Sequence, residues 1–336
     1  MSARGKWAEA GISVADLGEF GLIAAIAELL PPDPRLTVPV GDDAAVLAIP
    51  DGRVVATTDV LVEGRHFRRD WSGPEDVGVK AAAQNLADVA AMGAWPRTLL
   101  VGLACPADVE AQWVLDMVRG LVAECGRAGA SIAGGDVTAA GCIMLGITAL
   151  GELIEGQPPV TRSGARPGDV VAVAGRLGWS AAGLALLRDG LARSGRNVSP
   201  ELAGLIGAHL RPQPPYPAGP AAAAAGATAM VDVSDGLLQD LGHVAAASHV
   251  CIGLDTGKFP PAGPMATAAE LLGARSLDWV LAGGEDHALA ATFPAHAAIP
   301  AGWSVVGEVT AGAGVLVDNA AWEGPAGWDH FRKPVN

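Results

Sequence analysis

The sequence predicts a two-domain protein whose N-terminal half has an α/β fold, and three observations support this prediction. The chain has 336 residues, which is more than one domain usually carries. Half of the residues are hydrophobic and 17% are charged, which indicates a compact protein and excludes a disordered one. Strand and helix patterns alternate in the first half, and a polar, turn-rich stretch follows near residue 155. We therefore expect domains at residues 1–155 and 156–336.

The first domain is expected to begin with an amphipathic helix and then to alternate strands with helices. Asp51-Gly52 is typical of a hairpin turn, and the strand that follows is expected to end at Asp59. Asp76 can cap the next helix, and Gly93 can end it. The predicted elements are a short strand led by residues 41–47, strands at 54–59, 98–104, 131–133 and 142–150, and helices at 20–30, 77–92 and 106–128.

The second domain is expected to contain further strands and helices after the boundary stretch. A proline-rich segment, Arg211–Pro217, predicts a rigid extended connector. The predicted elements are strands at 170–174, 229–231, 287–293, 303–309 and 313–317, and helices at 180–191, 220–225 and 237–248.

Charge and cysteine content exclude several classes of protein. The net charge of −14 disfavours binding to nucleic acid or to an anionic membrane. None of the four cysteines forms a C-x-x-C pair, so neither a zinc site nor a redox motif is expected. They fit free, buried thiols of a cytoplasmic protein. The apolar run at 20–30 is too short to span a bilayer, and no basic region precedes it, so a secretory signal is not expected.

One stretch offers metal-binding chemistry directly after a predicted buried strand. Val54–Ala56 is an apolar run, and it leads into Thr57, Thr58 and Asp59. Hydroxyl and carboxylate oxygens at the end of a rigid strand suit a hard cation such as Mg²⁺. His66 follows seven residues after Asp59. Taken alone, the segment is better explained as an ordinary Thr-Asp turn followed by a surface loop.

Similar groups recur along the chain, and their number favours a metal–phosphate site. Glycine lets the backbone approach a phosphate, and Asp oxygens with hydroxyls ligate Mg²⁺. The sequence has no Walker motif, no G-x-G-x-x-G and no G-x-S-x-G, which disfavours a P-loop, a dinucleotide site and a nucleophile elbow. The recurring groups are Gly41-Asp42-Asp43, Thr57-Thr58-Asp59, Gly134-Gly135-Asp136, Asp232-Val233-Ser234-Asp235 and Gly283-Gly284-Glu285-Asp286, with Asp88 on a polar helix face beside Lys80, Gln84 and Asn85.

In this order the motifs resemble those of the thiamine-monophosphate kinase family, from about Phe20 to Phe331. The resemblance implies a two-domain fold like that of aminoimidazole ribonucleotide synthetase. The N-terminal domain would carry a mixed sheet that forms a homodimer interface, and the C-terminal domain would be α+β. The motifs that carry the resemblance are those above together with Val60–Phe67, Asn85–Ala94, Thr161–Ala165 and Asp232–Leu237.

The resemblance also implies a reaction and its cofactors. ATP would phosphorylate thiamine monophosphate to thiamine diphosphate by direct in-line transfer, with several Mg²⁺ ions and no protein base or nucleophile. The implied metal ligands are Asp43, Thr57, Thr58, Asp59, Asp88, Asp136, Asp232 and Asp235. The implied nucleotide contacts are Gly135, Asp136, Arg162 and Ser234, and the implied substrate contacts are His66, Glu285 and Trp328.

The chain departs from the family pattern at a few positions. Thr57 stands where Ser is also common, which keeps the hydroxyl group. His287 stands where Tyr is familiar, which leaves the role of that side chain open. Trp328 lies in a weak local pattern, and Trp322 is an alternative substrate contact. His66 is expected to contact substrate rather than to act as a base, because the acceptor is itself a phosphate oxygen; the alternative is an ordinary loop histidine.

Other functions compete with this one. Aminoimidazole ribonucleotide synthetase, selenophosphate synthetase and a hydrogenase-maturation dehydratase share the superfamily. The last two use a reactive cysteine near the N-terminus or at the C-terminus, and this chain has neither a cysteine before Cys105 nor one in its closing residues, Lys333–Asn336. A different class is a non-catalytic protein that binds a divalent cation or a nucleotide, from which turnover would distinguish the kinase.

Overall fold

The computed structural model describes residues 12–38, 46–50, 52–190, 198–259 and 263–328. The chain divides into two compact units. The first comprises Met1–Val89 and Trp95–Glu155, and the second comprises Ala90–Ala94 and Gly156–Asn336. Each unit contains its own main sheet.

In the N-terminal unit a helix and a small two-stranded sheet precede alternating strands and helices. The elements are α1 (Val14–Ala27), β1 (Leu36–Val38), β2 (Val46–Leu47), β3 (Val54–Val62), α2 (Pro74–Ala91), β4 (Trp95–Cys105), α3 (Ala111–Ala128), β5 (Ser131–Ala139) and β6 (Met144–Glu152).

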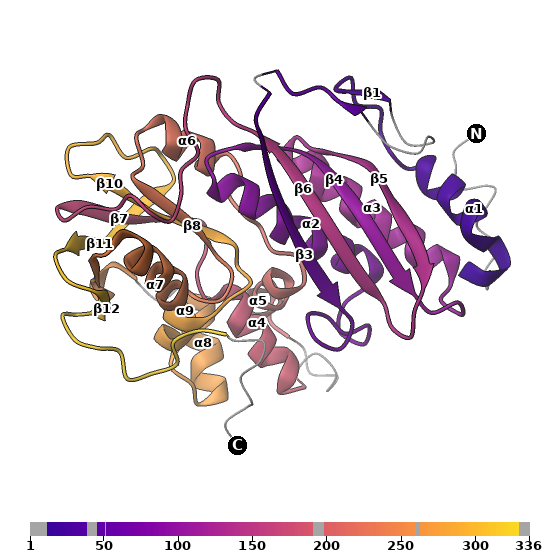
Figure 1. Ribbon diagram of the computed structural model, residues 1–336. Helices are drawn as coiled ribbons and strands as arrows, with labels where there is room; N and C mark the ends of the chain where they lie inside the picture. The colour runs from indigo at the N-terminus through magenta and orange to yellow at the C-terminus, as the bar shows by residue number, and fades with distance from the viewer. Residues whose placement is uncertain (1–11, 39–45, 51, 191–197, 260–262, 329–336) are drawn as a thin grey trace. The chain divides into compact units, whose positions relative to one another are not determined.

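The main sheet of this unit is mixed, as predicted, and has the order β3-β6-β4-β5. β6 pairs antiparallel with β3 and β4, whereas β4 and β5 run parallel. The helices α2 and α3 lie along one face of the sheet (Figure 1). Leu61, Leu99, Leu103 and Leu145 are almost fully buried, so the core of this unit lies on the helix-covered face.

The other face of this sheet exposes large apolar side chains. Val54 is 51% exposed, Val60 48%, Leu100 39% and Met144 40%. Where β3, β6 and β4 contain these residues, even-numbered residues pair with even-numbered residues. Because side chains alternate between the faces along a strand, all four lie on the same face. Several neighbouring apolar side chains that stay exposed together are typical of an interaction surface.

Two glycines fix the spacing between α2 and α3. A Cβ atom on Gly78 would lie 2.0 Å from the carbonyl oxygen of Met117, and one on Gly120 would lie 2.1 Å from that of Glu75. Any other residue would force the two backbones apart. The close crossing holds α2 at a defined position against the sheet, and α2 carries Asp88.

The strands β3 and β5 are longer than predicted. β3 continues past Asp59 to Val62, and β5 continues through Gly134–Asp136 to Ala139. The prediction that Asp59 ends its strand is therefore wrong. Nine pairs with β6 hold β3 along its whole length, and this pairing outweighs the low strand propensity of Asp.

The predicted hairpin at Asp51-Gly52 is also not formed. Asp51 lies outside the described residues, and Gly52 turns the chain with φ of 72°. β2 pairs with β1, however, whereas β3 pairs with β6, so the strands on either side of the turn do not pair with each other. The turn residue was recognised correctly, but the pairing depends on distant segments that local sequence does not reveal.

The C-terminal unit is α+β, as predicted. Its elements are β7 (Asp169–Ala174), α4 (Trp179–Arg188), α5 (Pro200–Leu210), α6 (Ala218–Ala224), β8 (Ala229–Val233), α7 (Leu237–Ser248), β9 (Cys251–Leu254), the 3₁₀ helix η2 (Thr256–Lys258), α8 (Gly263–Leu272), α9 (Ser276–Ala282), β10 (Ala288–Pro294), β11 (Trp303–Thr310) and β12 (Gly314–Val317).

The six-stranded sheet of this unit has the order β12-β9-β11-β7-β10-β8 and is antiparallel except between β9 and β12. α7 packs against β8, β9 and β12, and apolar side chains of these elements form the main core. A second apolar cluster joins α4, α5, α8 and α9. The sequence patterns did not predict α5, α8, α9 or β9, although Ser199 followed by Pro200 is a recognisable start for α5.

Among the helices of the described residues, none is long and apolar enough to cross a membrane.

Candidate functional site

In the N-terminal unit, Thr57 and Asp59 point to the face of the sheet that α2 covers. Thr57 Oγ1 donates a hydrogen bond of 2.8 Å to Asp88 Oδ2. The backbone N–H of Asp59 donates to Asn85 Oδ1 at 3.0 Å, and Asn85 Nδ2 donates to the carbonyl oxygen of Ala81 at 2.9 Å. β3 is an edge strand, so Asn85 satisfies a backbone donor that has no partner strand. The structure thus brings two predicted ligands into contact and fixes a third beside them.

Thr58 and Asp136 lie on the opposite, open face. Successive residues of a strand alternate between faces, and Thr58 Oγ1 donates to the carbonyl oxygen of Ile147 at 2.9 Å. Asp136 pairs with Gly102 in β4 and belongs to the other edge strand of the sheet. Within this unit the structure therefore does not bring either residue to Thr57 and Asp59. Asp43, the remaining predicted ligand of this half, lies outside the described residues.

Gly135 has a structural reason to be glycine. A Cβ atom at this position would lie 1.9 Å from the carbonyl oxygen of Val101. The close approach of β5 to β4 therefore explains this glycine without a nucleotide, and its predicted nucleotide contact stays a prediction.

His66 belongs to the tight turn after β3. The backbone N–H of Val62 donates to His66 Nδ1 at 3.0 Å, and the backbone N–H of His66 donates to the carbonyl oxygen of Val62 at 3.0 Å. Because Nδ1 accepts a hydrogen bond, the neutral ring carries its proton on Nε2. The side chain is half-buried and rigidly oriented, and it presents an N–H donor.

In the C-terminal unit, two of the predicted motifs pack backbone to backbone. The N–H of Glu285 donates to the carbonyl oxygen of Ser234 at 2.8 Å, and the N–H of His287 donates to that of Val233 at 3.1 Å. A Cβ atom on Gly284 would lie 2.2 Å from the Ser234 oxygen. Glu285 and His287 both have positive φ, 63° and 53°, which is uncommon for residues with a side chain. This close contact holds the two turns together.

The segment before the C-terminus joins the same site through Asp235. The N–H of Trp328 donates to the carbonyl oxygen of Asp235 at 2.9 Å. Gln239 Nε2 donates to Asp235 Oδ2 at 3.1 Å and to the carbonyl oxygen of Trp328 at 2.7 Å. The Trp328 side chain is 53% exposed, whereas Trp322 packs against the main core of the unit. Trp328 therefore lies beside the Asp235 turn with an exposed ring, and its contact with substrate stays a prediction.

Two buried carboxyl groups cap helices around these turns. Asp240 Oδ2 accepts hydrogen bonds of 3.0 Å from the backbone N–H groups of Asp235 and Gly236. Burial, reinforced by nearby Asp232, raises the pKa of Asp240 to about 7. Asp286 Oδ1 accepts a hydrogen bond of 2.8 Å from the backbone N–H of Ser180 at the start of α4. Burial raises the pKa of Asp286 to about 7. Among the described residues, Oδ2 of Asp286 has no hydrogen-bond partner.

His287 acquires a contact that the sequence did not indicate. Its Nδ1 lies 3.2 Å from Asp232 Oδ2, and both side chains are buried. A histidine that bonds a carboxylate orients it in the way that outer partners orient metal ligands. His287 therefore fixes one of the predicted metal ligands, Asp232.

Arg162 and Ser234 complete the predicted nucleotide contacts in this unit. Ser234 lies in the turn between Asp232 and Asp235. Arg162 is exposed, and its carbonyl oxygen accepts a hydrogen bond of 3.1 Å from Ser248 Oγ. No described contact joins Arg162 to Ser234.

Some residues near these turns escaped the sequence analysis, namely His209, Gln239 and Asp240. Asp240 lies four residues after Gly236, and its side chain accepts a hydrogen bond from the Gly236 N–H. The short spacing of an Asp after a helix start is a signal that the sequence contains. His209 has no such signal, because its partners are distant in sequence.

The donor set fits a hard cation, although the described residues do not assemble a complete site. Every predicted metal ligand offers oxygen, which is the ligand atom that Mg²⁺ prefers. Among the described residues, no group of three or more His, Cys, Asp and Glu side chains is gathered closely enough to hold a metal ion. The predicted ligands fall into separate groups, one on β3 and α2, another at the end of β8.

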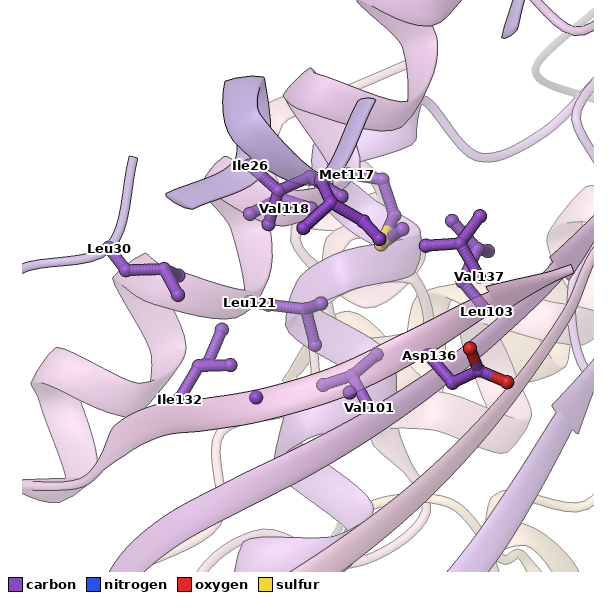
Figure 2. A pocket seen from close by; sticks show the side chains of 13 residues that line it. Ile26, Leu30, Val101, Leu103, Met117, Val118, Leu121, Ile132, Asp136 and Val137 are labelled. Atoms are coloured by element: carbon purple, nitrogen blue, oxygen red, sulfur yellow. The ribbon is translucent and has the colours of Figure 1, made fainter. Parts of the chain in front are cut away.

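A pocket of about 70 Å³ in the N-terminal unit is mainly apolar, unlike the polar turns described above. It lies between α1, α3 and the strands β4 and β5, and apolar side chains such as Ile26, Leu121 and Val101 line it (Figure 2). Asp136 is the one charged residue among those that line it, and its pairing with Gly102 directs its side chain toward the other face of the sheet. The lining is unsuited to polyphosphate, so the candidate site is the set of polar turns and not this pocket.

Comparisons with known proteins decide the family. The model of the AIR synthase related N-terminal domain matches residues 41–153, and that of the C-terminal domain matches residues 166–318. A thiamine-monophosphate kinase of Mycobacterium tuberculosis is 47% identical over 322 residues, which is 95% of this chain and 93% of that protein. The chain belongs to the thiamine-monophosphate kinase family. This confirms the resemblance drawn from the motifs.

Solved structures of the family agree with this assignment. The thiamine-monophosphate kinase from Stenotrophomonas maltophilia matches with a TM-score of 0.78 and 32% identity, over 90% of this chain and 96% of that one. AaThiL complexed with AMPPCP and TMP matches with a TM-score of 0.77 and 35% identity, over 96% of this chain and all of that one. The two-domain fold expected from the sequence is thereby confirmed.

Proposed function

We propose that the chain transfers the γ-phosphoryl group of ATP directly to the phosphate of thiamine monophosphate, giving thiamine diphosphate and ADP with Mg²⁺ present. The observation that carries the proposal is the match, over 96% of this chain, to a protein in complex with AMPPCP and TMP. AMPPCP is an analogue of ATP, and TMP is the abbreviation of thiamine monophosphate. The oxygen-rich turns of both units supply the chemistry that such a reaction needs.

Most of the proposed metal ligands lie in two groups, one on β3 and α2 and another at the end of β8. Bound Mg²⁺ bridges phosphate oxygens and offsets the repulsion between the two polyanions. Thr58 and Asp136 lie on the other face from Thr57 and Asp59, so within one chain they would serve a different ion. This supports several ions rather than one. The proposed ligands are Asp43, Thr57, Thr58, Asp59, Asp88, Asp136, Asp232 and Asp235.

The proposed substrate contacts match the charges of thiamine monophosphate. Glu285 offers a carboxylate, and the exposed ring of Trp328 offers an aromatic face, and both suit a cationic ring. His66 offers an N–H donor, which suits a phosphate oxygen. Gly135, Asp136, Arg162 and Ser234 are the proposed nucleotide contacts. The cysteines are free thiols, which supports a cytoplasmic location.

The acceptor gives the first prediction: thiamine monophosphate is phosphorylated and free thiamine is not. An alcohol acceptor needs a base to take its proton in the transition state. A phosphate monoester has a second pKa of about 6 and is largely ionised at neutral pH, so its oxygen attacks without one. Coupled measurement of ADP release with each acceptor, with and without Mg²⁺, tests this.

The His66→Asn variant sharpens the acceptor test. It should bind thiamine monophosphate more weakly and keep the low-pH limb of the rate profile, because that limb follows ionisation of the substrate phosphate. Comparable turnover of free thiamine, or loss of that limb in His66→Asn, would show that a protein base acts here.

A second prediction concerns assembly: we infer that the open face of the N-terminal sheet forms the interface of a homodimer. Val54, Val60, Leu100 and Met144 are exposed together on that face, and such a surface is stabilised by burial. Introducing a charge there, as in Val60→Asp, should therefore convert a dimer into a monomer. Sedimentation velocity at micromolar concentration measures the change.

Val305→Asp is the matched control for the assembly test. Val305 is an apolar strand residue of the C-terminal unit with 42% exposure, so this change adds the same charge at a similar exposure. It should leave the dimer intact. A monomeric wild-type protein, or an undisturbed dimer of Val60→Asp, would rule out this interface.

A further inference from the structure

The carboxylate of Glu285 needs an orienting contact beyond its own turn. Its backbone is fixed, because its N–H bonds Ser234 and its φ is 63°. These contacts fix the positions of the Glu285 Cα and Cβ atoms. The side-chain torsions are determined by other interactions. The side chain is 32% exposed, and a glutamate at such a site otherwise samples several rotamers.

A buried histidine from a different element meets this carboxylate. His209 lies near the end of α5 and is 5% exposed. Its Nδ1 lies 3.4 Å from Glu285 Oε2 and 3.0 Å from Ser180 Oγ. Ser180 belongs to α4 and is fully buried. Gly183 allows this arrangement, because a Cβ atom there would lie 2.1 Å from the carbonyl oxygen of Leu205 in α5.

The carboxylate of Glu285 favours the His209 tautomer that carries its proton on Nδ1. A bare Nδ1 lone pair facing a carboxylate oxygen would be repelled by it. An Nδ1–H group is instead attracted to Glu285 Oε2, and the Ser180 hydroxyl oxygen accepts from the same side. The ring is therefore held with its proton toward the carboxylate, and it restrains Oε2 without removing the charge of Glu285.

Ser180 connects both carboxyl groups of the turn to α4. Its hydroxyl group contacts His209, which contacts Glu285, and its backbone N–H donates to Asp286 Oδ1. The Glu285-Asp286 turn is therefore anchored from one side by α4 and α5 and from the other by Ser234.

We propose that His209 is a positioning residue that holds the Glu285 carboxylate ready for the cationic ring of thiamine monophosphate. The proposal rests on the proposed function, because Glu285 acts on the substrate only if that substrate binds there. His209 does not touch the reacting atoms, so its loss weakens substrate binding rather than the transfer step.

Three substitutions of His209 separate a positioning role from a packing role. His209→Asn places its amide where Nδ1 lies, His209→Gln places it nearer to Nε2, and His209→Phe fills the space without a donor. The KM for thiamine monophosphate should rise about tenfold in the Phe and Gln variants, because the polar contact between His209 and the Glu285 carboxylate is lost. It should stay within about twofold of wild type in the Asn variant. The KM for ATP and kcat should change little in all three.

Controls and outcomes make the test decisive. His243→Asn changes an exposed histidine of α7 and should leave both KM values unchanged. In a Glu285→Gln background, replacing His209 by Gln should have no further effect on the KM for thiamine monophosphate. The proposal is overturned if Asn and Gln behave alike, if the KM for ATP rises in parallel, or if the effect persists without Glu285. Should the Phe variant not fold, the Asn and Gln pair alone decides. Absence of turnover in the wild-type protein would overturn the proposed function instead, so the two failures are distinct.

Discussion

Replacing Asp59 by asparagine should lower kcat by roughly 100-fold or more, because the carboxylate that we propose as a metal ligand is lost. The fold should survive. The hydrogen bond that ties Asp59 to Asn85 uses the backbone N–H of Asp59, so the substitution does not remove it. Asparagine also has nearly the same size. Steady-state kinetics over a range of Mg²⁺ concentrations, with Mn²⁺ binding measured by electron paramagnetic resonance, would record both effects.

Asp108→Asn is the matched control, because Asp108 is an exposed carboxylate that lies outside both ligand groups. It should leave kcat and the Mg²⁺ dependence unchanged. An active Asp59→Asn protein with the Mg²⁺ dependence of the wild type would contradict the assignment of Asp59 as a metal ligand.

Gly284→Ala should destabilise the C-terminal unit and remove most of the activity at once. The added Cβ atom would lie 2.2 Å from the carbonyl oxygen of Ser234, and backbone atoms cannot rotate away as a side chain can. The two turns must separate, which disturbs Asp235 and Glu285 together. We expect a loss of about 1–3 kcal/mol, the usual range for overpacking. Thermal unfolding and the rate of ADP formation measure the two effects.

Gly242→Ala provides the comparison, because no atom lies within 4 Å of a Cβ atom at that helical position. This change should leave the activity intact and stabilise α7 slightly, since alanine favours helix. A fully stable, active Gly284→Ala protein would mean that the two turns are not held together as described.

The sequence was informative where a local pattern determines the structure. Alternation of strand and helix, together with the polar stretch near Glu155, indicated the α/β half of the fold. The strand lengths were less accessible. β3 runs through Asp59 because β6 pairs with it along nine residues, and this pairing is a property of a distant segment. Neighbouring residues of a strand point to opposite faces, which places Thr57 and Thr58 on different faces of the sheet. This inference requires that the strand extends past Asp59, which the sequence did not indicate.

The site was predictable as motifs but not as contacts. Thr57 and Asp88 were both selected from the sequence, whereas their hydrogen bond depends on how α2 packs on the sheet. His209 gave no signal, since its link to Glu285 joins residues 76 positions apart and forms only when α5 folds against α4. In the sequence, a single histidine within an apolar helix indicates only an ordinary core residue. That the backbone of Trp328 bonds Asp235 was likewise not predictable, because these residues are distant in sequence.

The buried carboxyl group of Asp286 couples the folding of this chain to protons. Its pKa is about 7 in the folded protein, because burial disfavours the charge, against an ordinary value of 3.8. Between these values the folded chain holds a proton that the unfolded chain releases, so this group favours folding most in acid and progressively less toward neutrality. The limiting slope is about 1.4 kcal/mol per pH unit. Above neutral pH this group therefore carries a negative charge within the turn that also carries Glu285, and its contribution to folding is lost there.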